Sequence, residues 1–216
     1  MLEKLKAEVV SCAKNAEQLG LCRNKSGNFS CRDRDTGLIL MTPTGADRSK
    51  LQADDIVVMN PNGEVVEALT GLKPTSEALM HIAAYEARPE VMAVVHTHSK
   101  YAVTFAAIGR KIPAIIIEAA HLNPQKGYIP LAPFARQGTK ELGDSVKEPL
   151  KECDGILLAN HGALTVADNL SAALTKAAYV EEIAEIYYHT LLLGAELQPL
   201  PPDDLVLRYP DLNKIK

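Results

Sequence analysis

The chain has 216 residues, of which 47% are hydrophobic, so it can bury one substantial core and is expected to form one domain over residues 1–216. Its formal net charge of −4 argues against a nucleic-acid partner, and no apolar run reaches the length that would span a membrane. The four cysteines form no C-x-x-C pair and the first residues are charged and amphipathic, which together predict a cytoplasmic protein with reduced thiols.

The first part of the chain is predicted to contain two helices with hairpins between them. Apolar residues spaced three and four apart predict a helix over residues 2–19, which Gly20 ends. A second helix is expected over residues 78–85, with Thr75 or Ser76 as its N-cap. Between these helices, short apolar runs separated by turn residues predict strands at residues 29–31, 38–41, 54–59 and 64–67.

Residues 91–99 begin with aliphatic residues and end in His-Thr-His-Ser, which predicts a buried strand that leaves the core at its end. Because side chains alternate along a strand, His96 and His98 point the same way, with Cα atoms roughly 6.6 Å apart. Two imidazoles at that spacing can share one metal ion. The same pattern also marks an ordinary strand end in solvent, so the pair alone leaves both interpretations open.

The remainder of the chain alternates strands and helices. Hairpins followed by this alternation predict a single α/β domain with a mixed, largely antiparallel central sheet. Residues 119–137 are expected to be irregular, and a Pro-rich arm begins at about residue 198. Helices are predicted at residues 99–108, 139–151 and 170–193, and buried strands at 112–118 and 155–159.

Three of the six histidines follow predicted strands. His161 comes directly after residues 155–159, as His96 and His98 end the earlier strand. Three histidines that leave one position open are typical of a catalytic zinc site, whereas a structural site uses four ligands. The other histidines, at positions 81, 121 and 189, fall in a helix, a loop and the long terminal helix, where packing or solvation explains them better.

Three short polar loops offer backbone N–H groups and small donor side chains that can hold a phosphate. The third also opens a helix, where free N–H groups favour an anion. Each loop taken separately is also ordinary turn or capping chemistry, and the glycine motifs of nucleotide-binding proteins do not occur. The loops are Gly27-Asn28, Thr44-Gly45 and Thr75-Ser76.

Glu77 follows the third loop and lies in the first turn of the predicted helix. A glutamate there is often only a favourable partner for the helix dipole. Beside a metal ion, however, its carboxylate would be a suitable base for a proton next to a carbonyl.

Five motifs in this order resemble those of the class II aldolase and adducin-head family, particularly its L-fuculose-1-phosphate aldolase branch. The resemblance covers roughly residues 1–195. The motifs are Gly27-Asn28-Phe29-Ser30, Thr42-Pro43-Thr44-Gly45, Lys73-Pro74-Thr75-Ser76-Glu77, Val94-Val95-His96-Thr97-His98 and Ala159-Asn160-His161-Gly162.

The resemblance implies a three-layer α/β/α sandwich that assembles as a C4 homotetramer with active sites at the subunit interfaces. It implies Zn²⁺, or another divalent metal, on His96, His98 and His161, with Glu77 as the acid/base. Phosphate is then held by Asn28, Thr44, Gly45, Thr75 and Ser76, while Gly27 shapes the first loop. The implied reaction is reversible cleavage of a ketose 1-phosphate to dihydroxyacetone phosphate and an aldehyde, with a small phosphorylated sugar as the substrate.

The resemblance weakens where the aldehyde part of the substrate would lie. The fuculose aldolases place a tyrosine in the strand matched here by residues 115–117, and this chain has isoleucines there. Glu118, His121 and Tyr209 are the expected residues on that side of the substrate. Epimerisation, dehydration or decarboxylation at the same metal site are alternatives, although the epimerase branch typically carries Asp where Glu77 stands. A non-catalytic interaction module like the adducin heads is a further alternative, against which the intact histidines argue.

Overall fold

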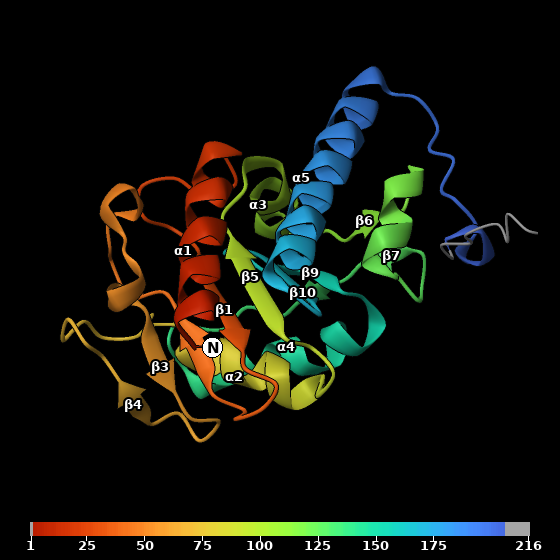
Figure 1. Ribbon diagram of the computed structural model, residues 1–216. Coiled ribbons are helices and arrows are strands. Elements are labelled where there is room, and N and C mark those ends of the chain that lie inside the picture. The colour runs from red at the N-terminus through yellow and green to blue at the C-terminus, as the bar shows by residue number, and fades with distance from the viewer. Residues whose placement is uncertain (1, 206–216) are drawn as a thin grey trace, which may run out of the picture.

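An eight-stranded sheet forms the middle layer of the protein, in the order β4-β3-β2-β1-β5-β10-β9-β8 (Figure 1). The computed structural model describes residues 2–205. Neighbouring strands pair antiparallel except β8 and β9, which are parallel, so the predicted mixed and largely antiparallel sheet is confirmed. The strands are β1 (Asn28–Arg32), β2 (Ile39–Met41), β3 (Val57–Met59), β4 (Val65–Glu67), β5 (Ala93–Thr97), β8 (Leu131–Ala132), β9 (Gly155–Leu158) and β10 (Gly162–Ala167).

Helices cover both faces of this sheet, which gives the expected three layers. One face carries α1 (Leu2–Gln18), α3 (Lys100–Ala107) and α5 (Leu170–Leu193), and the other carries α2 (Ala78–Ala87) and α4 (Lys140–Glu152). In Figure 1, α1 and α5 cross the near side of the sheet, while α2 and α4 lie behind it. None of the helices within residues 2–205 is long and apolar enough to cross a membrane.

Strand β5 lies in the centre of the sheet, and its alternating side chains enter both cores. Val94 packs with α2 and α4, whereas Ala93 and Val95 pack with α1 and α5. All five residues of the strand are buried, which explains its valine-rich composition. His96 lies two residues after Val94, so the two side chains are on the same face of the strand and His96 points toward the α2 side of the sheet.

The predicted strand over residues 112–118 is wrong beyond its first two residues. Only Ile112–Pro113 forms a strand, β6, which pairs with β7 (Tyr128–Ile129) in a separate two-stranded sheet. The Pro113 nitrogen cannot donate to a ladder, and Ile117 is 60% exposed, so neither supports a central strand. The chain instead forms the 3-10 helix η3 (Ile117–Leu122).

Two further expectations need correction. The region expected to be irregular, residues 119–137, contains β7, β8 and the end of η3. The N-cap of α2 is Glu77 and not Thr75 or Ser76. Thr75 still serves this terminus, because its Oγ1 accepts a hydrogen bond from the Glu77 backbone N–H at 3.3 Å.

The described part of the Pro-rich arm lies against the rest of the chain. The Leu200 N–H donates to the Ala114 carbonyl at 2.8 Å, and Leu205 is 4% exposed in the core beneath α5. The arm therefore contributes to the apolar core on the α3 and α5 side. Tyr209 lies outside the described residues.

Candidate active site

Four side chains converge at the end of β5. The ligand atoms of Glu77, His96, His98 and His161 all lie within 4.8 Å of one another. The three imidazole rings face one another at nearly equal distances, with centroids 4.8 to 5.0 Å apart. The structure thus brings the three predicted histidines and the predicted base to one point, although they lie far apart in the sequence.

His96 is held in one orientation by the neighbouring strand. Its ring is fully buried, and Nδ1 donates to the Ala163 carbonyl of β10 at 2.9 Å. A carbonyl oxygen only accepts, so Nδ1 carries a proton, and Nε2 is the ring atom left to face the cluster and to ligate a metal ion. That Nε2 lies 2.9 Å from Nε2 of His98, which places both nitrogens at the centre of the cluster.

His161 reaches the cluster from the hairpin between β9 and β10, and the Asn160-His161-Gly162 sequence explains its position. Asn160 has φ +58, a left-handed conformation that asparagine tolerates in tight turns. A Cβ at Gly162 would lie 2.3 Å from the Thr97 carbonyl oxygen and 3.0 Å from His96 Cε1. Only glycine therefore lets this hairpin approach the end of β5.

Glu77 enters the cluster from the N-terminus of α2 and is 1% exposed. Its Oε2 lies 3.2 Å from His96 Nε2, and its Oε1 lies 3.1 Å from His161 Nε2. Burial raises the pKa of this carboxyl group, but the charge of His96 and the contacts with His161, His96 and Asn28 outweigh the effect of burial and hold the pKa well below the usual range. Glu77 is therefore a carboxylate, as a base requires.

The donor atoms of this cluster suit a divalent metal ion. Ligands on a tetrahedral Zn²⁺ lie about 3.3 Å from one another, close to the separations of 2.9 to 3.2 Å between the facing donor atoms. Burial, together with the nearby His96 and His161, lowers the pKa of His98 to about 3, so its imidazole is neutral and able to ligate. The Glu77 Oε1 atom is buried with no hydrogen-bond partner among the described residues, which also fits a cationic neighbour.

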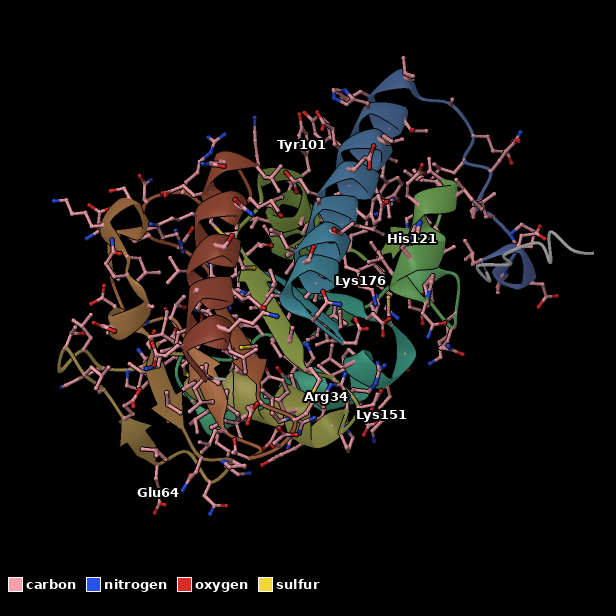
Figure 2. The ribbon with its side chains drawn as sticks, in the orientation of Figure 1. Arg34, Glu64, Tyr101, His121, Lys151 and Lys176 are labelled. Atoms are coloured by element: carbon pink, nitrogen blue, oxygen red, sulfur yellow. The ribbon has the colours of Figure 1, made fainter. Side chains whose placement is uncertain are left out.

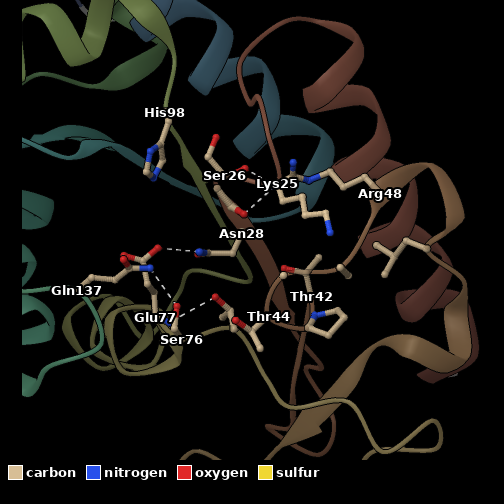
Figure 3. A pocket seen from close by; sticks show the side chains of 16 residues that line it. Lys25, Ser26, Asn28, Thr42, Thr44, Arg48, Ser76, Glu77, His98 and Gln137 are labelled. Carbon is tan, nitrogen blue, oxygen red and sulfur yellow. Dashed lines mark hydrogen bonds between the residues drawn. The ribbon is translucent and has the colours of Figure 1, made fainter.

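A cavity of about 210 Å³ opens beside the cluster (Figure 3). Glu77 and His98 lie at one side of it, so the cavity and the metal-type cluster share a wall. In Figure 3 the side chains of Asn28, Thr44 and Ser76 lie around one space. All six residues predicted to hold phosphate line it: Gly27, Asn28, Thr44, Gly45, Thr75 and Ser76.

Sheet register explains why the first polar loop borders the histidines. Asn28 begins β1 and pairs directly with His96 of β5, so the two side chains lie on the same face of the sheet. Gly27 has φ +78, and a Cβ there would lie 2.5 Å from Cys22 Sγ and 2.6 Å from the His96 carbonyl oxygen. Glycine is thus required for the loop to pass this close to β5.

Three long polar side chains that line this cavity were not predicted from the sequence, namely those of Lys25, Arg48 and Gln137. Arg48 is 6% exposed, and its Nη2 donates to the carbonyls of Ser26 and Gly27, the second at 2.8 Å. Gln137 donates from Nε2 to Ser76 Oγ at 3.0 Å. The local sequence of Arg48 and Gln137 carries no signal for these roles, because each acts on a loop that is distant in the sequence.

The expected substrate-side residues are not brought to this cavity by the described chain. His121 stacks on Tyr179 of α5, with ring centroids 4.9 Å apart, and Figure 2 shows it beside that helix. Glu118 lies on the same 3-10 helix as His121 and does not line the cavity within residues 2–205. Tyr209 is among the residues that are not described.

Comparison with known proteins gives one consistent result. Residues 7–188 match the family described as Class II Aldolase and Adducin N-terminal domain. The chain is 37% identical over 205 residues to 5-deoxy-D-ribulose 1-phosphate aldolase of Bacillus thuringiensis serovar kurstaki, covering 95% of this chain and 93% of that protein. It is 36% identical over 206 residues to L-fuculose phosphate aldolase of Escherichia coli strain K12, covering 94% of this chain and 92% of the relative.

Solved structures agree with these relatives. A structure of L-fuculose 1-phosphate aldolase superposes with a TM-score of 0.88 at 33% identity, covering 94% of this chain and 92% of that one. YgbL from Klebsiella pneumoniae, described as a candidate aldolase/epimerase/decarboxylase, superposes with a TM-score of 0.83 at 26% identity. The superposition covers 95% of this chain and 97% of that one.

Proposed function

The chain belongs to the class II aldolase and adducin N-terminal domain family, and on that premise we propose that it cleaves a ketose 1-phosphate reversibly to dihydroxyacetone phosphate and an aldehyde. The observation that carries this proposal is the shared wall between the histidine cluster and the cavity lined by the three polar loops.

The phosphate end of the substrate is assigned to the cavity. Its lining combines loop N–H groups, the amide of Asn28 and the hydroxyls of Thr44, Thr75 and Ser76, all of which can donate to phosphate oxygens. The N-terminus of α2 adds the positive end of its dipole. The relatives from B. thuringiensis and E. coli are both named for phosphorylated sugars, which agrees with this assignment.

His96, His98 and His161 would hold the metal ion, which we assign as Zn²⁺. Three imidazoles with an open position form a catalytic zinc site, and the Nδ1–H of His96 on the Ala163 carbonyl fixes the tautomer that ligation needs. An ion bound there would act as a Lewis acid toward the oxygens of the substrate. Imidazole also suits other first-row metals, so elemental analysis of the purified protein identifies the ion.

Glu77 is assigned the proton transfer at carbon 3 of the substrate. Cleavage breaks the bond between carbons 3 and 4, and carbon 3 then needs a proton to become the hydroxymethyl group of dihydroxyacetone phosphate. The Glu77 carboxylate lies in the wall between the phosphate cavity and the histidines, where that carbon would lie. Its buried position excludes competing water, and its ionised state allows it to take the proton back in the synthetic direction.

The assembly is proposed to be a C4 homotetramer with the active sites at subunit interfaces. The cavity is open on one side, and Phe134, three residues before the cavity residue Gln137, is 66% exposed. We expect a second subunit to cover this apolar side chain. Residues on the aldehyde side of the substrate, among which we expect Glu118, His121 and Tyr209, would then meet the site across such an interface.

The test is product analysis with the purified, zinc-loaded protein on fuculose-, rhamnulose-, ribulose- and 5-deoxyribulose-type 1-phosphates. Release of dihydroxyacetone phosphate from at least one of them supports the aldolase. A stereoisomer of unchanged mass would identify an epimerase, and loss of water or of carbon dioxide would identify a dehydratase or a decarboxylase. Absence of both bound metal and turnover would favour a non-catalytic module.

A further inference from the structure

A line of hydrogen bonds runs from the base of the proposed reaction into the core between β1 and α2. The Asn28 Nδ2 donates to Glu77 Oε2 at 2.7 Å, and Asn28 Oδ1 lies 2.5 Å from His81 Nε2. On the other side of the same ring, His81 Nδ1 lies 2.7 Å from Ser30 Oγ, which in turn lies 2.8 Å from the Tyr85 hydroxyl. All five side chains are buried, and those of His81 and Ser30 are inaccessible to solvent.

The orientation of the Asn28 amide determines the donors along this line. Asn28 Nδ2 donates to Glu77 Oε2, so the NH₂ group of Asn28 faces the carboxyl group. The carbonyl oxygen of the same amide then faces His81 Nε2 and must receive a proton from it. His81 is therefore protonated at Nε2.

The donors and acceptors in the other half of the line, from His81 to Tyr85, follow from the surroundings of His81. No carboxylate contacts its ring among the described residues, and burial lowers its pKa to about 3, so the ring is neutral. A neutral ring with its proton on Nε2 has a lone pair on Nδ1, which accepts from the Ser30 hydroxyl. Ser30 Oγ is then free to accept from the Tyr85 hydroxyl, so the polar side-chain atoms from Asn28 to Tyr85 all have a partner.

We propose that His81 is a positioning residue for the reaction proposed above. Its Nε2–H holds the Asn28 amide with the NH₂ group toward Glu77. Without that donor, the buried carbonyl oxygen of Asn28 loses its partner. The amide would then shift toward another donor and draw its NH₂ group away from Glu77, which would let the carboxylate move from its place beside the phosphate cavity. This inference depends on the proposed function only for the role of Glu77, because the direction of the line is a property of the folded protein.

A residue that only filled space in this part of the core would not need the hydrogen-bonding groups of His81. The remaining buried residues around His81 on α2, such as Met80, Ile82 and Ala84, are apolar and fill the same layer. An apolar pair in place of His81 and Ser30 would pack there without the cost of desolvating an imidazole and a hydroxyl group. The hydrogen bond that the neutral imidazole donates to the Asn28 carbonyl oxygen explains its placement between Ser30 and Asn28.

The direct test is the tautomer of His81, read from nitrogen-15 NMR of the histidine-labelled protein. The His81 signal is assigned by its loss in His81→Gln. We expect the neutral form with its proton on Nε2; a proton on Nδ1, or on both nitrogens, would overturn the proposal. Because this readout needs no substrate, a correct tautomer in a protein that cleaves no ketose 1-phosphate would contradict the proposed function alone.

The kinetic test compares two substitutions at the same position. Glutamine carries an N–H donor the same number of bonds from Cα as Nε2, so His81→Gln should retain kcat within about threefold, whereas His81→Met should lower it about 10- to 100-fold. Ile82→Ala, a buried change at the next position of α2, controls for loss of stability and should leave kcat unchanged. Equal losses in His81→Gln and His81→Met, or a loss in neither, would refute a positioning role.

Discussion

At the scale of single residues, the chemistry depends on a carboxylate that is kept ionised in a buried position. Glu77 is 1% exposed, and its contacts with His96, His161 and Asn28 offset the cost of its burial. The same contacts place it beside the cluster that suits a metal ion and beside the cavity that suits a phosphate. A single side chain therefore connects the two halves of the site.

Replacement of Glu77 by glutamine is predicted to separate binding from chemistry. The amide keeps the shape of the side chain but cannot exchange a proton at carbon 3, so kcat should fall by about 10²- to 10⁴-fold. Metal content, measured by elemental analysis, should remain near that of the wild type, because the three histidines are unchanged. Full turnover in Glu77→Gln would exclude it as the acid/base.

Arg48 is predicted to act on binding of the phosphate and not on the chemical step. Its guanidinium holds the carbonyls of Ser26 and Gly27, so its loss should let the first polar loop relax. Loss of such charge-assisted bonds should raise KM about tenfold for Arg48→Met, with kcat little changed. Lys50→Met, an exposed lysine on the same 3-10 helix, is the control, and an equal effect in both variants would contradict the assignment.

At the scale of elements, the site depends on contacts between segments that are distant in the sequence. Helix α3 starts two residues after His98, and its first N–H groups are capped by the carboxylate of Glu181 from α5. Glu181 accepts from Tyr101 N–H at 2.9 Å and from Ala102 N–H at 2.9 Å. This cap anchors the end of the segment that carries His98.

Loss of the cap is predicted to destabilise the protein and loosen His98. Glu181→Ala should lower the free energy of unfolding by about 1 to 2 kcal/mol, as expected when a helix loses its capping acceptor. It should also weaken metal affinity, measured by competition with a chelator. Glu182→Ala removes an exposed neighbour on the same helix and should change neither quantity. If the two variants behave alike, the cap has no such role.

The elements that could be predicted from the sequence are those whose signal is local. The valine run before His96 and the turns of the polar loops are readable from a few adjacent residues. The mixed sheet follows from the order of the predicted strands and helices along the chain. The strand over residues 112–118 failed because Pro113 and an exposed Ile117 outweigh the isoleucine run. Arg48, Gln137 and Glu181 act on loops or helix ends 21, 61 and 80 residues away, and no local pattern encodes such contacts.

At the scale of the whole molecule, the three layers bring the ends of β1, β5, the β9–β10 hairpin and α2 to one place (Figure 1). The metal-type cluster and the phosphate cavity lie on neighbouring strands, so one fold can hold both ends of a sugar phosphate. We propose that residues 1–216 form a single domain, which the packing of Leu205 into the core beneath α5 supports.

The proposed tetramer predicts both a mass and a loss of activity. Analytical ultracentrifugation should give about four times the protomer mass of 23.4 kDa. Phe134→Asp puts a charge on the exposed apolar residue beside the cavity and should lower both the mass and kcat/KM, with far-UV circular dichroism unchanged. A monomeric wild type with full activity would refute active sites shared between subunits.

The central claim is that this site moves a proton at carbon 3 of dihydroxyacetone phosphate, and proton NMR in deuterium oxide tests it without knowledge of the aldehyde. The metal-loaded protein should exchange one of the two hydroxymethyl protons of dihydroxyacetone phosphate for deuterium. Removal of the metal with a chelator, or substitution Glu77→Gln, should abolish the exchange. Retention of both protons with the metal-loaded wild type, or exchange that persists in Glu77→Gln, would contradict the account.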